Sequence, residues 1–390
     1  MDASTESGAV ESSCRQDADT NTRDGCAPRI TCRAHACRTT KPAVNAIPQY
    51  RELETRILAA MRGGLAEPEF GALALAIHRF QRQWNAPYGK WCATRPEPRN
   101  WREIPAVPQA MFKRYALSVA PDEVTKTFRT SGTTGEGHGE HHLIDTQLYD
   151  AAILHGWDRL RMKTDPAFVI LAPSPEEAPH SSLSHMFAVL ARERGSRLSM
   201  FILADDGSLD AERFLNMMSS VFHAHQPVGL LGTALAFLNL FEQLGTRGEM
   251  RRKGSFAIET GGYKGSGRDV PKAELYAKFG EHFDIRPDAV INEYGMTELS
   301  SQFYSRGLGQ AHDGPPWLRG LVIDPETERE VAVGESGVLR IFDLANLGSV
   351  LAIQTQDLAI RRERGFELLG RDPVALPRGC SRAADERMRR

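Results

Sequence analysis

The spacing of hydrophobic residues changes several times along this chain. Residues 1–45 contain almost no large apolar side chain, and we predict a disordered polar tail because such a segment cannot bury enough surface to fold. From Tyr50 onward, apolar residues recur at helical spacing in two groups: Tyr50, Leu53, Ile57, Leu58 and Met61, then Phe70, Leu73, Ile77, Phe80 and Trp84. Two amphipathic helices are therefore expected to open the folded part of the chain.

The middle of the chain alternates between helical and extended patterns. Helices are predicted over residues 148–162, 184–194, 209–223, 234–244 and 271–283. Short apolar runs between them predict strands at residues 168–171, 198–203, 228–231, 255–260 and 289–291. This alternation indicates an α/β fold with a mostly parallel sheet covered by helices.

Past Tyr304 the helical pattern fades. Residues 318–323, 331–333 and 337–342 read as antiparallel strands, and the segment from about 348 to 390 reads as another short-stranded piece with a polar, Arg-rich end. We therefore predict three parts: the tail, an α/β domain over residues 46–345, and a short C-terminal segment over residues 346–390.

Composition narrows the possible partners. The chain has 390 residues with 48 Lys and Arg against 50 Asp and Glu, so its net charge of −2 gives no footprint for a nucleic acid or an anionic membrane. Its longest weakly polar run, residues 227–241, is shorter than the roughly 20 residues of a membrane helix. The N-terminus lacks a secretory pattern, so we expect a cytoplasmic protein that acts on a small molecule.

The cysteines gather near the N-terminus. Four of the six stand there, Cys14, Cys26, Cys32 and Cys37. Disulfides are not expected in the cytoplasm, and the spacing lacks the paired C-x₂-C knuckles of a typical zinc site.

One loop carries the composition of a phosphate site. It consists of Thr130, Ser131, Gly132, Thr133, Thr134 and Gly135. Small and hydroxyl side chains leave its backbone N–H groups open to an anion and add further donors. The same residues are also typical of a polar surface turn, so the loop alone leaves both interpretations open.

Two further loops follow predicted strands. Gly261 and Gly262 follow the strand at 255–260, and a polar run follows the strand at 289–291. Because ligands of open parallel sheets bind at the carboxyl ends of strands, these loops are expected to converge.

The polar run supplies several kinds of ligand group. Gly295 permits a tight turn, Tyr294 offers an aromatic face for a base, and Thr297 and Glu298 offer oxygen ligands. Glu298 suits Mg²⁺, which takes a carboxylate together with substrate phosphates. Farther on, Asp357 is placed to accept hydrogen bonds from ribose hydroxyls. The alternatives are a surface acid for Glu298 and a turn acid for Asp357.

Together these motifs resemble a known family. The loop at 130–135, the run Tyr294-Gly295-Met296-Thr297-Glu298, Thr355-Gln356-Asp357 and Gly370-Arg371 occur in the order and approximate spacing of the adenylate-forming (AMP-binding) superfamily. Within it, the chain looks most like the acyl-protein synthetases of the LuxE type. The resemblance implies the α/β N-terminal domain of an adenylate-forming enzyme, with mostly parallel, helix-covered sheets and a small antiparallel β subdomain.

The resemblance also implies a two-step ligase reaction. A carboxylic acid, expected to be a fatty acid, attacks the α-phosphate of ATP to give an acyl adenylate and pyrophosphate, and the acyl group then passes to a thiol. The 130–135 loop would hold the β- and γ-phosphates and Glu298 would position Mg²⁺. Gly261 and Gly262 would lie along the adenine with Tyr294 stacked on it, Asp357 would hold the ribose, and Arg371 would sit near the ribose or phosphates.

Two departures from the family stand out. The phosphate loop usually continues to a lysine, but here residues 136–142 contain none, and His138, His141 or His142 would have to serve as donor unless all three are exposed loop histidines. Because the sequence ends at Arg390, we also expect the full C-terminal lid domain that carries the family's adenylation lysine to be absent.

The acyl acceptor is open at this point. The resemblance points to Cys380, beside Arg378 and Arg382, as the thiol that carries the acyl group to a partner protein such as a reductase; a plain cysteine in a flexible tail is the alternative. Other hypotheses are an acyl- or aryl-CoA ligase, a ligase joining an acid to an amine or alcohol, and a catalytically weak nucleotide-binding protein. The acid is expected near residues 180–187 and 228–235, with His185 facing the carboxylate or lying at the core edge.

Overall fold

The computed structural model describes most of the chain after the N-terminal segment. The described residues are 45–130, 137–162, 165–203, 208–245, 253–261, 270–371 and 388. The chain divides into two units, Met1–Val44 and Asn45–Arg390, and the account below concerns the second. The tail predicted for the N-terminus lies, up to residue 44, outside the described residues.

The unit contains two large sheets, of which the first has six strands. Its strands are β4 Ala167–Leu171, β5 Met200–Phe201, β6 Val228–Thr233, β7 Phe256–Thr260, β8 Val290–Tyr294 and β9 Phe303–Arg306. They lie in the order β5-β4-β6-β7-β8-β9, all parallel except β9, which runs antiparallel to β8. The predicted parallel, helix-covered sheet is confirmed.

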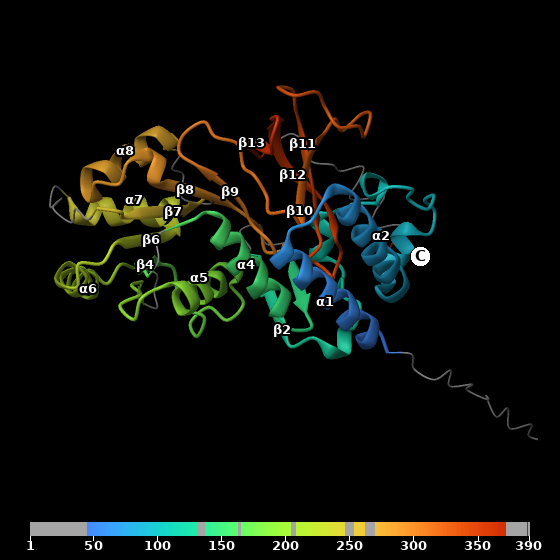
Figure 1. Cartoon of the computed structure of the whole chain (residues 1–390), viewed down its shortest axis with the longest axis horizontal. Helices are drawn as coiled ribbons and strands as arrows, with labels where there is room; N and C mark the ends of the chain where they lie inside the picture. The colour runs from blue at the N-terminus through green and yellow to red at the C-terminus, as the bar shows by residue number, and fades with distance from the viewer. Residues whose placement is uncertain are drawn as a thin grey trace, which may run out of the picture. The chain divides into compact units, whose positions relative to one another are not determined.

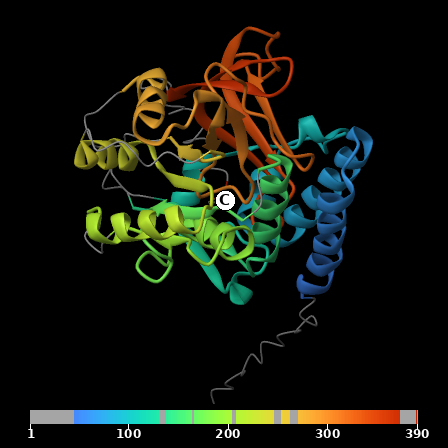
Figure 2. The same ribbon diagram turned by 60° about the vertical axis from the view of Figure 1, so that its left-hand side comes forward.

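Helices cover both faces of this sheet (Figures 1 and 2). One core joins alternate strand residues to α6 Ala211–His223, α7 Ala234–Leu244 and α8 Lys272–Phe283. The opposite core joins the remaining strand residues to α4 Gln147–Arg159 and α5 Ser182–Arg194. Because both faces are buried, the strands read as continuous apolar runs, which is why the sequence located them.

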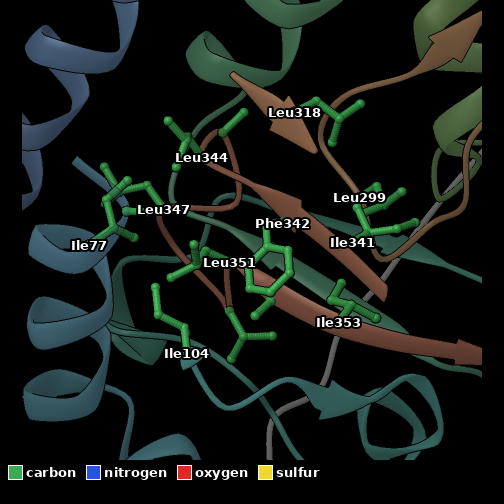
Figure 3. Close-up of a cluster of buried hydrophobic side chains, with 14 of the residues drawn as sticks. Ile77, Ile104, Leu299, Leu318, Ile341, Phe342, Leu344, Leu347, Leu351 and Ile353 are labelled. Carbon is green, nitrogen blue, oxygen red and sulfur yellow. The ribbon is translucent and has the colours of Figure 1, made fainter. Parts of the chain in front are cut away.

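The second large sheet has five strands. It contains β1 Val107–Pro108, β10 Leu318–Ile323, β11 Ser336–Asp343, β12 Ala352–Arg361 and β13 Phe366–Arg371. The order is β1-β12-β11-β10, with β13 also paired to β12, and every pair except β1 with β12 is antiparallel. Its core includes the apolar faces of α1 Ile47–Gly63 and α2 Glu67–Trp84, as predicted, and Figure 3 shows its centre.

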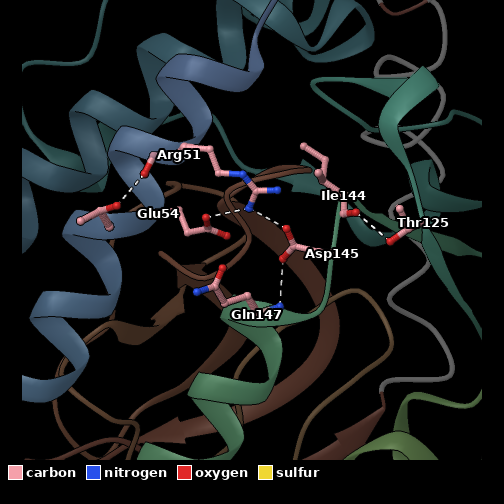
Figure 4. A network of polar contacts seen from close by, with 7 residues as sticks. Arg51, Glu54, Thr125, Ile144, Asp145 and Gln147 are labelled. Carbon is pink, nitrogen blue, oxygen red and sulfur yellow. Dashed lines mark hydrogen bonds and ion pairs between the residues drawn. The ribbon is translucent and has the colours of Figure 1, made fainter.

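Short elements connect these parts. They are α3 Ala86–Cys92, the hairpin strands β2 Lys126–Arg129 and β3 Glu140–Leu143, and the 3₁₀ turns Trp101–Glu103, Gln109–Lys113, Pro121–Glu123 and Pro287–Ala289. A polar contact fixes α1 against the start of α4. Arg51 Nη1 lies 2.7 Å from Glu54 Oε2 and 2.6 Å from Asp145 Oδ2, and Asp145 also accepts from the Gln147 N–H (Figure 4). Within the described part of the chain, no helix is long and apolar enough to span a bilayer.

Three predictions about local structure were wrong. Strand β8 runs through Tyr294, so residues 292–294 lie on a strand and not in a loop. Residues 331–333 form no strand, because Gly334 turns the chain at φ 93° and the chain here makes only an isolated bridge between Ile323 and Glu330. Strand β12 is ten residues long, and it was underestimated because two of its buried positions hold polar residues, Thr355 and Asp357, which breaks the apolar/polar alternation typical of a strand.

Candidate functional site

The structure describes about half of the predicted site residues. Thr130, Gly261, Tyr294, Gly295, Thr297, Glu298 and Asp357 are described. Ser131, Gly132, Thr133, Thr134, Gly135, Gly262 and Cys380 lie outside the described residues. Arg371 ends β13, and its backbone lies opposite Asp357 in the strand register. The proposed roles of all these residues remain predictions.

The base of the predicted phosphate loop is a closed hairpin. Strands β2 and β3 pair up to Arg129 and Glu140, and the Thr130 N–H then donates to the Gly139 carbonyl at 2.9 Å. The Gly139 N–H donates in turn to Thr130 Oγ1 at 2.8 Å. A methyl group placed on Gly139 would lie 3.2 Å from Thr130 Cγ2 and 3.6 Å from Glu298 Oε1. The loop base and the Glu298 carboxylate are therefore neighbours.

Glu298 is a buried residue, which contradicts the alternative of a surface acid. The residue is 3 % exposed, and Gln109 Nε2 donates to its Oε1 at 3.1 Å. Its backbone carbonyl accepts from Asn346 Nδ2 at 2.8 Å. No motif marks Gln109 or Asn346, which lie 189 and 48 residues away along the chain, so the sequence did not indicate them.

His141 is not an exposed loop histidine. It lies on β3 with no exposed surface, its Nδ1 is 2.9 Å from the Thr297 carbonyl oxygen, and its Nε2 is 3.0 Å from Ser349 Oγ. Burial lowers the pKa of the imidazole to about 4, so it is neutral at pH 7. His141 therefore cannot replace the missing lysine as a cationic phosphate donor. His138 lies at the loop base with its Nδ1 2.6 Å from the Thr130 carbonyl oxygen.

Asp343 fixes the backbone that follows Glu298. Its Oδ2 accepts from the N–H groups of Ser300 and Ser301 at 3.0 and 2.8 Å. Its Oδ1 accepts from the Ser301 hydroxyl at 2.8 Å and from the Ala345 N–H at 3.0 Å. Burial raises the pKa of Asp343 to about 6, although these donors lower it. Asp343 is the last residue of β11 and belongs to no motif, so the sequence did not indicate it.

Asp357 and Tyr294 form a direct pair. The Tyr294 hydroxyl donates to Asp357 Oδ2 at 2.7 Å, and both residues are buried. The Tyr294 ring packs edge-on against Phe366 at 5.6 Å and lies 6.1 Å from Phe303. The predicted ribose ligand and the predicted adenine platform thus meet at one corner of the site, although they are 63 residues apart in sequence.

A polar cluster links β7 and β8 to the start of α8. Asn292 Nδ2 donates to Glu259 Oε1 at 2.7 Å, while Asn292 Oδ1 accepts from Lys272 Nζ at 2.8 Å and from His312 Nε2 at 2.7 Å. Burial raises the pKa of Glu259 and lowers that of His312 to about 3. Each polar group helps to satisfy its neighbour, so the cluster holds these elements together.

Glu293 points to the other face of β8. It lies opposite Thr260 and Tyr304 in the strand register, and burial raises its pKa to about 7 despite the hydrogen bond from Thr260. A methyl group on Gly295 would stand 2.5 Å from Glu293 Oε1. Gly295 has no positive φ, so it makes room for this carboxylate and does not serve the tight turn expected from the sequence.

The predicted acid-binding region also contains a polar contact. His185 Nε2 lies 2.6 Å from Asp150 Oδ1. The centroid of the His185 ring lies 5.3 Å from that of Phe128 and 5.6 Å from that of Tyr149. His185 is thus a partly buried residue at the edge of the core. Two surface cavities, of about 370 and 400 Å³, contain none of the predicted site residues.

Comparisons with known proteins found distant relatives. No protein-family model matches the chain. In sequence, it is 21 % identical to the long-chain-fatty-acid–luciferin-component ligase of Aliivibrio fischeri over 73 % of this chain and 77 % of the relative. The ligase of the same name from Vibrio harveyi is 20 % identical over 67 % of this chain and 70 % of the relative.

The fold is similar to that of solved adenylate-forming enzymes. A 2-hydroxyisobutyryl-CoA ligase bound to its acyl adenylate superposes with a TM-score of 0.56 at 13 % identity, over 79 % of this chain and 69 % of that one. ATP-bound MatB from Rhodopseudomonas palustris gives a TM-score of 0.46 at 22 % identity over 66 % of this chain, and the match spans 49 % of that structure.

The chain has the α/β fold of the adenylate-forming enzymes, as the sequence predicted. Its resemblance to the LuxE-type members of that superfamily is confirmed by the two curated relatives, both of which are named ligases. The assignment of the chain to the ligase class agrees with both comparisons.

Proposed function

We propose that the chain activates a carboxylic acid with ATP, forming an acyl adenylate and pyrophosphate, and then transfers the acyl group to a thiol. One observation carries this proposal: the closed base of the 130–135 loop lies directly beside the buried Glu298 carboxylate. The fold and the two ligase relatives support the same chemistry. The acid is proposed to be a fatty acid, as in the relatives' printed name.

The first step needs several groups in fixed positions. The acid's carboxylate oxygen attacks the α-phosphorus, a P–O bond forms, and the bond from the α-phosphorus to the bridging oxygen breaks as pyrophosphate leaves. The hairpin closed at Thr130 and Gly139 presents the loop whose N–H groups are proposed to hold the β- and γ-phosphates. Asp357, oriented by the Tyr294 hydroxyl, is proposed to accept from the ribose.

Glu298 fits a magnesium ion. Mg²⁺ prefers hard oxygen ligands and commonly takes one protein carboxylate with substrate phosphates, and Glu298 offers a carboxylate beside the proposed phosphate loop. Bound there, the ion would neutralise charge on the phosphates. Gln109 holds Oε1, which fixes the direction of the carboxylate. Among the described residues, no group of three or more His, Cys, Asp or Glu forms a ready-made metal site.

In the second step, a thiol sulfur attacks the acyl carbonyl, a thioester forms and AMP leaves. We propose Cys380 as this thiol, with onward transfer to a partner protein such as a reductase. Transfer to coenzyme A, an amine or an alcohol is the alternative, and a weakly active nucleotide-binding protein is the third hypothesis.

Pyrophosphate exchange tests the first step. Radiolabelled pyrophosphate should enter ATP only when an accepted acid is present, and a panel of fatty and aromatic acids identifies which acid that is. Glu298→Gln should reduce exchange by about 100-fold, because removing one charge-stabilising group from such a site commonly costs that much. If no acid in the panel supports exchange by the wild-type chain, the proposal fails and the nucleotide-binding hypothesis gains support.

Acyl labelling tests the second step. With ATP and a labelled acid accepted in the exchange assay, we expect a hydroxylamine-sensitive label on the wild type and none on Cys380→Ser. Cys92→Ala is the matched control, because Cys92 is buried and burial raises the pKa of its thiol to about 11, which makes it inert. Label that persists in Cys380→Ser contradicts the assignment, and label appearing on added coenzyme A favours the alternative.

A further inference from the structure

The backbone around Glu298 is held by side chains from distant parts of the chain. The Thr297 carbonyl contacts His141, the Glu298 carbonyl accepts from Asn346, and the N–H groups of Ser300 and Ser301 donate to Asp343. The next side chain, Leu299, is buried in the core with Ile341 and Phe342 (Figure 3). The position of Glu298 therefore depends on these hydrogen bonds and on the burial of Leu299.

The role of each His141 nitrogen follows from its partner. A carbonyl oxygen only accepts, so the Nδ1 that lies 2.9 Å from the Thr297 carbonyl carries the proton and donates it. The neutral ring then presents an acceptor at Nε2, and the Ser349 hydroxyl donates to it at 3.0 Å. Both nitrogens are satisfied, and this arrangement fixes the ring's tautomer and orientation.

A second layer of contacts holds Ser349 itself. Asn85 Nδ2 donates to the Ser349 carbonyl at 3.0 Å, and Gln81 contacts three backbone groups of residues 346–351. The ring of Phe112 packs edge-on against His141 at 5.9 Å. The imidazole is therefore held by Phe112, Ser349 and the Thr297 carbonyl, so a displacement of the ring would act on the Thr297 backbone.

We propose that His141 is a positioning residue that sets the Glu298 carboxylate through the Thr297 carbonyl. The inference rests on the proposed function of Glu298 and concerns a residue whose buried ring contacts Thr297 and Ser349. Outer residues that orient a ligand commonly change metal affinity when they are replaced. Losing the Thr297 bond should therefore raise the Mg²⁺ concentration that the enzyme needs.

Two substitutions at this position separate the two bonds of the ring. In His141→Asn, the amide nitrogen lies near the former Nδ1, so the donor to Thr297 is kept and the Ser349 contact is lost. In His141→Gln, the amide reaches the former Nε2 position, so the Ser349 contact is kept and the Thr297 donor is lost. We expect the half-saturating Mg²⁺ concentration for acid-dependent exchange to rise about tenfold in His141→Gln, and less than about threefold in His141→Asn.

Ser349→Ala is the second arm, and it guards against misfolding at position 141. It leaves the imidazole and its Thr297 bond in place, so its Mg²⁺ requirement should stay within about threefold of wild type. Urea unfolding of all three variants identifies any general loss of stability. Equal Mg²⁺ requirements in His141→Gln and His141→Asn would overturn the proposal, as would a tenfold rise in Ser349→Ala.

A second readout separates this inference from the proposed function. ATP affinity, measured by calorimetry with and without Mg²⁺ and without any acid, should show the same loss of Mg²⁺ enhancement in His141→Gln alone. A wild type that binds ATP with Mg²⁺ but exchanges no pyrophosphate would refute the proposed ligase activity while leaving this comparison intact. Wild-type ATP binding that Mg²⁺ does not enhance would refute the positioning role.

Discussion

The two carboxylates of the proposed site, Glu298 for Mg²⁺ and Asp357 for the ribose, are held in different ways. Glu298 lies on an irregular segment, and the groups that fix it come from Gln109, His141, Asp343 and Asn346. Asp357 lies inside β12, opposite Arg371 of β13, at a point where the register between β12 and β11 shifts. Its N–H donates to Thr355 Oγ1, and the Tyr294 hydroxyl orients its side chain.

This difference follows from backbone hydrogen bonding. A strand in a sheet satisfies most of its own N–H and C=O groups. Where the pairing of β12 with β11 shifts, the neighbouring Thr355 hydroxyl accepts from the Asp357 N–H and donates to the Leu339 carbonyl, so this corner needs few partners from distant parts of the chain. An irregular buried segment has no such ladder, and each of its polar groups requires a side-chain partner from elsewhere. We therefore expect the Glu298 corner to be sensitive to substitutions far from the ligand and the Asp357 corner to be tolerant of them.

The largest effect is expected from Asp343→Ala. It removes the acceptor for three backbone N–H groups and one hydroxyl in a buried place, so we expect a loss of about 4 kcal/mol of unfolding free energy. Urea denaturation measures it. The exposed Asp288 is the control, and its replacement by alanine should cost no more than about 0.5 kcal/mol. Similar losses for the two variants would break the comparison.

Glu293→Gln, on β8, is expected to have an intermediate effect on the unfolding free energy that depends on pH. Burial raises the pKa of Glu293 from 4.5 to about 7, so the folded chain holds a proton that the unfolded chain releases between these values. Wild-type stability from this group is present below pH 4.5 and is lost as the pH rises through 7. The variant should thus gain up to about 3 kcal/mol relative to wild type between pH 4.5 and 8.

Urea unfolding at pH 4.5 and 8 checks this sign. Thr260→Val provides a second test. The Thr260 hydrogen bond lowers the pKa of Glu293, so its loss should raise the pH at which the stability from Glu293 is lost. A difference between Glu293→Gln and wild type that is the same at both pH values would show that this carboxyl is not held in its neutral form.

The smallest effect is expected from Tyr294→Phe. It removes the hydrogen bond to Asp357 but keeps the ring packed against Phe303 and Phe366, so we expect a loss of about 1 kcal/mol. Asp357→Asn serves as the matched control, because its side-chain oxygen still accepts from the tyrosine. A loss from Tyr294→Phe as large as that of Asp343→Ala would show that the Asp357 corner also depends on its side-chain contacts.

The fold was predicted well where burial on both faces gave a clear pattern. The continuous apolar run of β4 and the amphipathic helices α1 and α2 were found at nearly their observed bounds. The predictions failed where that signal weakens: β12 mixes polar and buried positions, and the supposed strand at 331–333 includes Val333, which is 53 % exposed.

For the site, the sequence identified motif residues but not the residues that hold them. Glu298 and Asp357 stand in recognisable runs, whereas Gln109, Asp343 and Asn346 stand in segments with no motif. His141 was considered as a phosphate donor, and only its burial showed that it is a neutral residue with both nitrogens in use.

The sequence by itself determined the order of helices and strands, the α/β class and the run of motif residues from Thr130 to Arg371, because hydrophobic spacing and local residue types are written along the chain. Only the tertiary structure decided which of them meet. The bond from His141 to Thr297 spans 156 residues and the bond from Tyr294 to Asp357 spans 63. Such contacts depend on how sheets and helices pack, and local spacing does not encode that packing.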